Sequence, residues 1–401
     1  MINATYDFLI VGGGIFGISS AVTLAERGHK VGLINPDKIP HHLAASTDIS
    51  KAVRMEYGSD TEYFEMAEEC IRGWREWNEL FDEEVYREVG FLMLSKSSFD
   101  DNESSYEQSS YRQLVDHGYE PERIKGDEIS KRFPILKKNV YQEACLNPIG
   151  GYCFSGTAVQ CLAKYARSIG VSIHEGHTAH KLVIENGRLQ AIHTLEDGQF
   201  KFQKAIIAAG PYTPYLVPDL KPYFKATGHP VFWLYPENGA PFRYPNLSVF
   251  MADIAQTGWY GFPLSETHGV VKVARHSAGL TMDPRNKDRR VTDMEVRDMR
   301  TFVNNTFNGL ENAPLVYTRR CLYTDTLDGH FWIDHHPEID GLMVSTGGSG
   351  HGMKMGPVIG KMTADIAEGR QHAYSNRYNW RHLESDTVQR EEARHLPNRS
   401  L

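Results

Sequence analysis

Cysteines are few in this 401-residue sequence, and their spacing is irregular. The five cysteines are odd in number, and none of them forms a Cys-x-x-Cys pair or lies at metal-binding spacing from histidines. They are Cys70, Cys145, Cys153, Cys161 and Cys321. The pattern argues against a disulfide framework and against a structural zinc site, and we predict no metal. Because disulfides persist in oxidising compartments, we expect a reducing environment and a cytoplasmic protein.

Long apolar runs and an excess of positive charge are also missing. No apolar run approaches the ~20 residues that a transmembrane helix needs, so we expect no membrane association. The first residues lack the basic stretch of a signal peptide, and residues 398–401 differ from the peroxisomal Ser-Lys-Leu pattern. The formal net charge is −8, so nucleic acid is not an expected partner. We expect instead a small-molecule ligand, bound by a monomer or a small homo-oligomer.

The first forty residues carry a glycine pattern that is typical of dinucleotide-binding turns. Gly12, Gly14 and Gly17 form Gly-x-Gly-x-x-Gly, with Ile15 and Phe16 before the last glycine. Gly12 permits a tight turn, Gly14 lets a pyrophosphate approach the backbone, and Gly17 allows a helix to pack closely on a strand. The N–H groups at the helix N-terminus then face the phosphates. The predicted flanking elements are a buried strand over 7–11, a helix over 18–27 and a second strand over 30–34.

The end of the second predicted strand departs from the usual pattern. An acid usually binds the ribose hydroxyls at this point, but the sequence has Asn35, followed by Pro36 and Asp37. Asn35 can hydrogen-bond a hydroxyl without charge, and Asp37 is a second candidate for that contact. The absence of the acid weakens the prediction that this strand end binds a ribose, but it does not affect the prediction that the glycine turn binds phosphate. These residues by themselves do not choose between FAD and NAD.

The rest of the sequence predicts two kinds of sheet. With 41% hydrophobic residues the chain can bury a core of ordinary size. Helices are predicted over 64–81, 157–170, 294–307 and 356–367, and strands over 90–94, 171–173, 204–210 and 342–346. The strand that ends at Ala209-Gly210 can return beside the first strand, and a hairpin with an Asn-Gly turn spans 182–194. Residues 223–328 alternate like antiparallel sheet, with strands over 231–235, 247–251, 259–262 and 270–273.

We therefore predict an α/β protein in which a Rossmann-like dinucleotide-binding domain is interleaved with an antiparallel-sheet substrate domain. The first domain comprises residues 1–88, 150–222 and 329–385, and the second comprises residues 89–149 and 223–328. The chain beyond about residue 380 is charged and polar, so residues 386–401 are expected to form a surface tail.

Residues suited to flavin chemistry gather in two late stretches. Residues 319–324 include Cys321, and residues 347–354 read Gly-Gly-Ser-Gly-His-Gly-Met-Lys before a predicted helix. Backbone N–H groups of a glycine-rich stretch at a helix N-terminus can stabilise negative charge on a reduced flavin. Lys354 stands where its ammonium group can reach a substrate carboxylate.

Together with the glycine fingerprint, these stretches resemble the monomeric sarcosine oxidase and fructosyl amino acid oxidase group of the D-amino acid oxidase-like FAD-dependent oxidoreductases. The resemblance covers about residues 5–370 and implies FAD as the cofactor, bonded covalently to Cys321 through the flavin 8-methyl carbon. It also implies that Lys272 lies near flavin N5 and promotes the reaction with oxygen, because a cation stabilises the anion formed from O₂.

The same resemblance implies a substrate site. Arg54 and Lys354 would bind the substrate carboxylate, Arg54 as a fork and Lys354 as a point charge. Tyr260 and His276 would line the site, and Lys51 with Asp48 resembles the fructosyl amino acid oxidase variant of that segment. The implied cofactor-binding residues are Gly12, Gly14, Ile15, Phe16, Gly17, Asn35, Ser46, Thr47, Lys51, Ala209, Gly210, Cys321, Gly347, Gly350, His351, Gly352, Met353 and Lys354.

Several of these residues also have a plain structural interpretation. Cys321 can be an ordinary buried cysteine, and Lys272 can be a solvated residue at a sheet edge. Arg54 can form a surface ion pair with Glu56 or Asp48. His351 can be a histidine whose ring has only structural partners.

The resemblance predicts an oxidase that converts the C–N bond of a secondary amine on an amino-acid-like substrate to an imine and reduces O₂ to H₂O₂. The alternatives are an FAD-dependent amine dehydrogenase with another electron acceptor, a flavin-dependent biosynthetic tailoring enzyme, and a sensor that binds the dinucleotide without turnover. A flavin monooxygenase would need NAD(P)H, for which the sequence has no second fingerprint.

Overall fold

The apolar strands predicted around the glycine fingerprint form the centre of an eight-stranded sheet. β1 (Thr5–Val11) pairs in parallel with β2 (Val31–Asn35) on one side and with β12 (Gln199–Ile207) on the other. β9 (Ser172–Glu175) and β20 (Leu342–Thr346) extend the parallel part beyond β2 and β12. Strands covered on both faces need continuous apolar sequence, which these segments have. The predicted return of the 204–210 strand beside the first one is confirmed.

Two antiparallel additions complete this sheet. β10 (Ala179–Glu185) and β11 (Arg188–Thr194) form the predicted hairpin. Its turn residues Asn186 and Gly187 have φ values of 51° and 73°, which Asn and Gly tolerate better than other residues do. β19 (Trp332–His335) pairs with β20, which lies on the same side of β12 as the hairpin but further along that strand.

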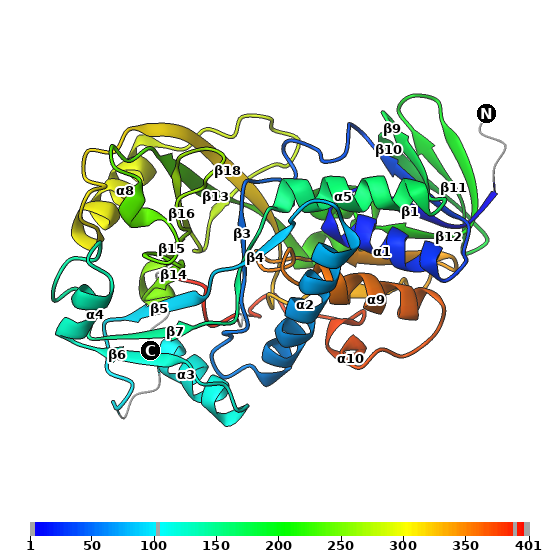
Figure 1. Ribbon diagram of the computed structural model, residues 1–401. Coiled ribbons are helices and arrows are strands. Elements are labelled where there is room, and N and C mark those ends of the chain that lie inside the picture. Colours follow the sequence, from blue (N-terminus) through cyan, green and yellow to red (C-terminus); the bar gives the residue numbers. More distant parts are fainter. Residues whose placement is uncertain (1–4, 102–104, 388–390, 397–401) are drawn as a thin grey trace.

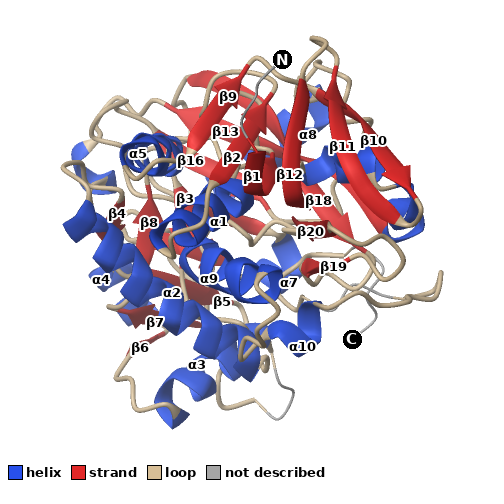
Figure 2. Cartoon of the chain, turned by 90° about the vertical axis from the view of Figure 1, so that its right-hand side faces the viewer, coloured by secondary structure: helices blue, strands red, loops and turns tan. Residues whose placement is uncertain are grey.

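Helices pack against the first sheet and against one another. α1 (Ile15–Glu26) contacts both α5 (Ser155–Ser168) and α9 (Gly356–Ala367), and α2 (Thr61–Leu80) packs beside α9, as Figure 2 shows. A Cβ on Gly360 of α9 would lie 2.8 Å from the carbonyl oxygen of Ser19, so glycine is needed for this close approach. The backbone of α9 is thereby held directly against the helix that follows the fingerprint.

A nine-stranded sheet forms the second half of the structure. β13 (Phe224–Leu234) pairs with β16 (Val271–Arg275) and with the long strand β18 (Leu315–Thr326), both antiparallel. Most neighbours in this sheet are antiparallel, but β5 (Phe91–Ser95) and β14 (Val249–Ala252) pair in parallel. The other strands are β5 (Phe91–Ser95), β6 (Glu122–Lys125), β7 (Glu143–Asn147), β14 (Val249–Ala252), β15 (Trp259–Gly261) and β17 (Leu280–Thr281).

The two larger sheets lie side by side, and the chain passes from one to the other repeatedly (Figure 1). Strands from residues 5–35, 172–207 and 332–346 build the first sheet, and strands from residues 91–147 and 224–326 build the second. A small third sheet joins β3 (Lys51–Val53), β8 (Gly151–Cys153) and β4 (Tyr86–Glu88). The predicted α/β fold class is confirmed, and the domain boundaries stay a prediction.

Several helices of the second half were not predicted, and the longest of them spans Tyr106–Asp116. α3 (Tyr106–Asp116) lies in a polar stretch, and its buried face includes Glu107, Gln108 and Gln113. The Ser105 side chain caps the helix by accepting a hydrogen bond from Gln108 N. The remaining helices are α4 (Asp127–Arg132), α6 (Thr213–Leu216), α7 (Ile254–Thr257), α8 (Asp293–Thr306) and α10 (Ser375–Tyr378).

The computed structural model describes residues 5–101, 105–387 and 391–396. Within these ranges, no helix combines the length and the apolar character that crossing a membrane requires. All five cysteines are buried and carry free thiols.

Candidate active site

The glycine fingerprint lies at the carboxyl end of β1, where the backbone turns into α1. Gly12 has a φ of 109°, and a Cβ there would lie 2.5 Å from the carbonyl oxygen of Ala208. A Cβ on Gly17 would overlap the carbonyl oxygen of Gly12. Gly14 is the N-cap of α1 and has no side chain to cap the first turn. N–H groups of that turn can therefore meet an anion, which fits the pyrophosphate of a dinucleotide.

Neutral side chains hold this turn. Asn35 Oδ1 accepts a hydrogen bond from Gly13 N at 2.9 Å, and Asn35 Nδ2 donates to Asp37 O at 2.7 Å. Ser46 Oγ accepts from Ile15 N at 3.0 Å. An amide can accept and donate at the same time, whereas a carboxylate only accepts, so the structure gives Asn35 a reason to replace the usual acid. Its contact with a ribose stays a prediction.

Other residues predicted to bind the cofactor flank the turn. Thr47 Oγ1 donates to His41 O at 2.8 Å. Ala209 and Gly210 follow the end of β12, and Gly210 has a φ of 53°. The side chain of Asp37, the second candidate for the ribose, is 54% exposed, and its carboxylate lies 4.0 Å from His41 Nε2.

The glycine-rich stretch before α9 packs against the fingerprint. A Cβ on Gly352 would lie 2.6 Å from the Phe16 ring, and a Cβ on Gly348 would lie 3.3 Å from it. Ser349 N donates to Thr324 O at 3.0 Å, which ties the stretch to β18. The absence of side chains at these glycines lets one backbone loop lie over both the fingerprint and the strand that carries Cys321.

His351 has structural partners on both ring nitrogens. Its Nδ1 lies 3.1 Å from the hydroxyl of Tyr57, and its Nε2 lies 3.2 Å from Gly329 O. The ring stacks on Phe331 with 4.9 Å between centroids. Burial lowers the pKa of His351 to about 3, so the ring is neutral near pH 7. The side chain thus fixes the glycine-rich stretch, and a direct contact with the cofactor stays a prediction.

A single pocket brings together four of the five predicted catalytic residues. Arg54, Tyr260, His276 and Lys354 line it. The other lining residues are Lys51, Ala52, Phe91, Ile254, Tyr323, Gly350, His351, Met353 and Glu391. Lys272 and Cys321 do not line this pocket.

Arg54 and Lys354 are buried in the pocket, and each donates a hydrogen bond to a tyrosine. Arg54 Nη1 donates to the Tyr106 hydroxyl at 2.9 Å, and its guanidinium lies 4.8 Å from the Tyr57 ring centroid. Lys354 Nζ donates to the Tyr57 hydroxyl at 2.9 Å. Burial, and then the charge of Arg54, lower the pKa of Lys354 well below its usual range. The surface ion pair considered for Arg54 is wrong, because its side chain is 7% exposed and lies 3.8 Å from Glu391.

Lys272 lies in a buried ion-pair cluster. Its Nζ lies 2.8 Å from Asp48 Oδ2 and 4.7 Å from the Phe262 ring centroid, and it donates to Ser50 O. The side chain is 2% exposed, so the interpretation as a solvated edge residue is wrong. Burial lowers the pKa of Lys272 to about 8, against the opposing effect of Asp48. Burial would raise the pKa of Asp48, but Lys272, Lys51 and Arg319 lower it to about 2.

Cys321 lies next to Lys51 on the same side of the site. The Cys321 Sγ and Lys51 Nζ are 3.7 Å apart, and both residues are shielded from solvent. Burial alone would lower the pKa of Lys51, but Cys321 and Asp48 raise it, so Lys51 carries its charge. A neighbouring cation stabilises a thiolate, the reactive form of cysteine.

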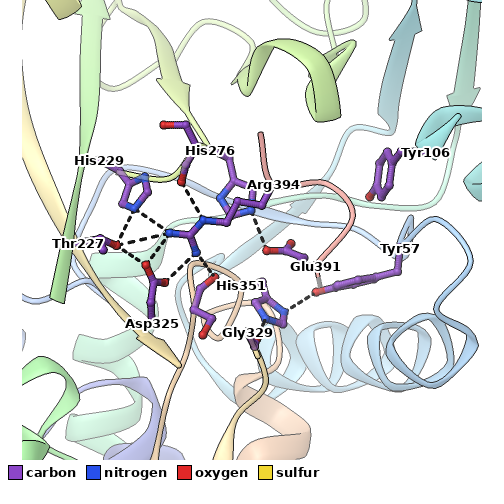
Figure 3. Close-up of polar contacts among 12 residues, drawn as sticks. Tyr57, Tyr106, Thr227, His229, His276, Asp325, Gly329, His351, Glu391 and Arg394 are labelled. Atoms are coloured by element: carbon purple, nitrogen blue, oxygen red, sulfur yellow. Dashed lines mark hydrogen bonds and ion pairs between the residues drawn. The ribbon is translucent and has the colours of Figure 1, made fainter. Parts of the chain in front are cut away.

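The C-terminal chain enters this site, and the expected surface position is wrong for Glu391, Ala393 and Arg394. Glu391, Ala393 and Arg394 are 8%, 0% and 1% exposed. Arg394 Nη1 lies 2.8 Å from Asp325 Oδ1 of β18, and Arg394 Nε donates to Ser277 O at 2.8 Å (Figure 3). A buried cation needs such partners, which only the folded chain supplies. No sequence motif marks Glu391 or Arg394, and residues 388–390 and 397–401 lie outside the described part.

Comparisons with known proteins agree on one family. A family model described as "FAD dependent oxidoreductase" matches residues 7–366. The chain is 26% identical over 369 residues to the peroxisomal sarcosine oxidase of Mus musculus, covering 90% of this chain and 92% of that protein. It is 26% identical over 373 residues to a monomeric sarcosine oxidase of Bacillus sp. (strain B-0618), with the same coverage. The structure of fructosamine oxidase (Amadoriase II) from Aspergillus fumigatus superposes with a TM-score of 0.81 at 21% identity, covering 99% and 95% of the two chains.

We predict that Arg394→Ala destabilises the protein by about 3–5 kcal/mol, because it leaves Asp325 as a buried charge without its cation. Urea unfolding, followed by tryptophan fluorescence, measures the change. Arg290→Ala is the matched control, since Arg290 pairs with Asp288 at the exposed surface and should cost less than about 1 kcal/mol. Equal stability of Arg394→Ala and wild type would contradict the anchoring role of Arg394.

Proposed function

The chain belongs to the family of FAD-dependent oxidoreductases, and from that premise we propose that it oxidises the C–N bond of a secondary amine on an amino-acid-like substrate to an imine, with reduction of O₂ to H₂O₂. The observation that carries the proposal is the pocket shared by Arg54, Lys354, Tyr260 and His276, beside the glycine-rich stretch. The similarity to sarcosine oxidases and to a fructosamine oxidase supports an amine as the substrate.

The residues of the fingerprint and of the glycine-rich stretch fit FAD. The turn at Gly12 and the first turn of α1 would hold the pyrophosphate. The backbone at Gly350 and Gly352, where side chains would clash with Tyr323 and Phe16, would lie along the flavin. When bound, FAD would accept the two electrons released by oxidation of the amine and would transfer them to oxygen. Cys321, beside the charged Lys51, would form the covalent link.

Arg54 and Lys354 would hold the substrate carboxylate. A guanidinium can grip a carboxylate with two hydrogen bonds, and burial strengthens this charge-assisted contact. An arriving carboxylate would also favour the charged form of Lys354, whose pKa burial and Arg54 lower in the free protein. Tyr260 and His276 would orient the amine, which must become neutral so that its lone pair is available for oxidation.

Lys272 would serve the reaction with oxygen. Its ammonium group is buried and held by Asp48, so its charge is placed without rearrangement. Lys51 and Arg319 add positive charge to the same cluster, since both lie 3.7 Å from Asp48. The alternatives, an amine dehydrogenase with another acceptor and a biosynthetic tailoring enzyme, would use the same pocket but need no role for Lys272 toward oxygen.

The proposed activity is tested with N-alkyl amino acids added to the purified holoprotein. Without oxygen, a substrate should bleach the flavin absorbance, and admission of air should restore it with release of H₂O₂. Trimethylglycine is the matched control, because its nitrogen has no lone pair and it should not bleach the flavin. Bleaching that only an added dye reverses would identify a dehydrogenase. A flavin that no amine bleaches would refute amine oxidation.

A covalent link to Cys321 predicts that the flavin stays with the protein when the protein is precipitated with acid. Flavin should stay in the wild-type pellet and should move to the supernatant in Cys321→Ala, because the thioether cannot form. Cys153→Ala is the control, since Cys153 is also buried and lies in β8, close to Lys51 of β3. Absorbance spectra of the pellet and the supernatant show which fraction contains the flavin. Colour in the wild-type supernatant would show that the flavin is bound without a covalent link, and the protein would still be a flavoprotein.

Lys272→Met should slow reoxidation of the reduced flavin by oxygen by on the order of 10²–10³-fold, with a much smaller effect on its reduction by substrate. The exposed Lys225→Met serves as control. In wild type the rate constant of reoxidation should fall as the pH rises through about 8, because Lys272 is charged below that pH and loses its proton above it. Stopped-flow absorbance measures both half-reactions separately. A normal reoxidation rate in Lys272→Met would exclude the oxygen role.

A further inference from the structure

A carboxylate of the protein itself lies where the substrate carboxylate is expected. Glu391 lines the same pocket as Arg54 and Lys354, and its Oε1 lies 3.8 Å from Arg54 Nη2. Its other oxygen, Oε2, lies 2.8 Å from His276 Nε2. Figure 3 shows Glu391 between the His276 side and the Tyr57 side of the site. The pocket therefore contains Arg54, Glu391 and His276 in contact with one another through Glu391, and no sequence motif predicted this arrangement.

The segment that carries Glu391 is a fixed wall of the pocket. Three residues later, Arg394 is held by Asp325, Ser277 and Thr227. His395 N donates to His276 O at 3.1 Å, which ties the segment to the residue that Glu391 contacts. Because these anchors are buried, Glu391 stays in the pocket when a ligand enters.

Because Glu391 stays in the pocket, a carboxylate ligand that binds there meets electrostatic repulsion from it. A ligand carboxylate on Arg54 would lie beside Glu391, so that two anions would share Arg54 unless Lys354 or another neighbouring group takes up a proton. Like charges in a shared buried site are costly, and the site can relieve the cost by taking up a proton. His276 is the neighbouring group that can accept it, because an imidazolium would then pair with Glu391.

A zwitterionic amino acid brings this proton with it. Its secondary amine arrives as an ammonium ion, and the amine must lose a proton before oxidation. If the proton passes to His276, the ligand carboxylate pairs with Arg54 and the imidazolium pairs with Glu391. Every charge in the loaded pocket then has an opposite partner, and the amine nitrogen carries its lone pair.

We propose that His276 and Glu391 form a proton-accepting pair, in which the substrate ammonium gives its proton to His276 and Glu391 holds the resulting imidazolium. This inference rests on the proposed amine oxidation. The N–H bond of the ammonium breaks, its electron pair stays on nitrogen, and the proton binds the imidazole. In the tautomer whose Nε2–H donates to Glu391, the accepting atom is Nδ1. Glu391 is a positioning residue, because it contacts Nε2 of the imidazole and would pair with the imidazolium once the proton has arrived.

The surroundings favour an ionised Glu391. Burial would raise the pKa of Glu391, but His276, His351 and Lys354 lower it well below its usual range. Other charged or titratable groups of the described chain also face the pair. They are Arg54 and Tyr57 after β3, Tyr106 of α3, His229 of β13, Tyr260 of β15, Tyr323 of β18, and Arg394. Lys354 is the competing proton acceptor, because burial and the charge of Arg54 lower its pKa well below its usual range.

The pair is tested by the protons that ligand binding takes up. Isothermal titration of the holoprotein at pH 8, in two buffers of different ionisation enthalpy, gives the number of protons bound with each ligand. Acetate, a carboxylate without a cation, should bind with uptake of about one proton. Trimethylglycine, whose carboxylate is accompanied by a fixed positive charge, should bind with an uptake near zero.

Glu391→Gln separates this role from a structural one. The variant should bind acetate on the order of tenfold tighter or more at pH 8, because the competing charge is gone, and it should take up almost no proton. Glu392→Gln is the matched control, since Glu392 is the next residue but bonds Ser59 instead of lining the pocket. It should behave like wild type. His276→Asn is a second variant, which should lose proton uptake without tighter acetate binding.

Three results would overturn the inference. The first is an unchanged proton uptake in Glu391→Gln together with its loss in Lys354→Met, which would assign the proton to Lys354. The second is equal acetate affinity of Glu391→Gln and wild type. The third is no acetate binding by either protein. The amine-bleaching assay is independent of these titrations: oxidation of amines without proton uptake would refute this pair alone, whereas a flavin that no amine bleaches would refute the proposed function.

Discussion

Buried charge governs the construction of this site, because a charged side chain taken out of water without a partner costs several kcal/mol. On one side of the pocket, Asp48 compensates Lys272 and Lys51. On the other side, Asp325 compensates Arg394, and Glu391 lies between Arg54 and His276. Apart from Asp48 and Lys51, which are three residues apart, the partners come from chain segments far apart in sequence. Formation of the site and closure of the tertiary structure are therefore one process.

Close approach of backbones is the second condition. Gly12 and Gly17 bring β1, β12 and α1 together, and Gly352 brings the glycine-rich stretch onto Phe16 of the fingerprint. This packing sets the distance between the glycine turn proposed to bind the pyrophosphate and the loop proposed to lie along the flavin. His351 holds that loop through Tyr57, whose hydroxyl also accepts from Lys354. The Tyr57 hydroxyl thus connects the glycine-rich loop with the pocket through hydrogen bonds to His351 and Lys354.

Local sequence rules succeeded where local physics decides the structure. The strand at 7–11, the helix after it and the Asn186-Gly187 turn follow from apolar runs and from residues that tolerate positive φ. They failed for α3, because its buried face contains Glu107, Gln108 and Gln113, and no apolar stripe marks it. They also failed for the chain after residue 390, whose charged composition indicated exposure, although Arg394 is buried by its ion pair with Asp325.

The sequence by itself determined the glycine turn after β1 and the α/β class, because glycine spacing and apolar periodicity act over a few residues. Its motifs also carried the resemblance to a group of flavoproteins. The resemblance implied site roles for Arg54, Tyr260, His276 and Lys354, which the structure brings into one pocket. Only the tertiary structure decided which charge faces which. The partnership of Glu391 with Arg54 and His276 joins residues 337 and 115 positions apart (391 − 54 and 391 − 276). Electrostatic pairing acts through space, and a charged residue has no local signature of its partner.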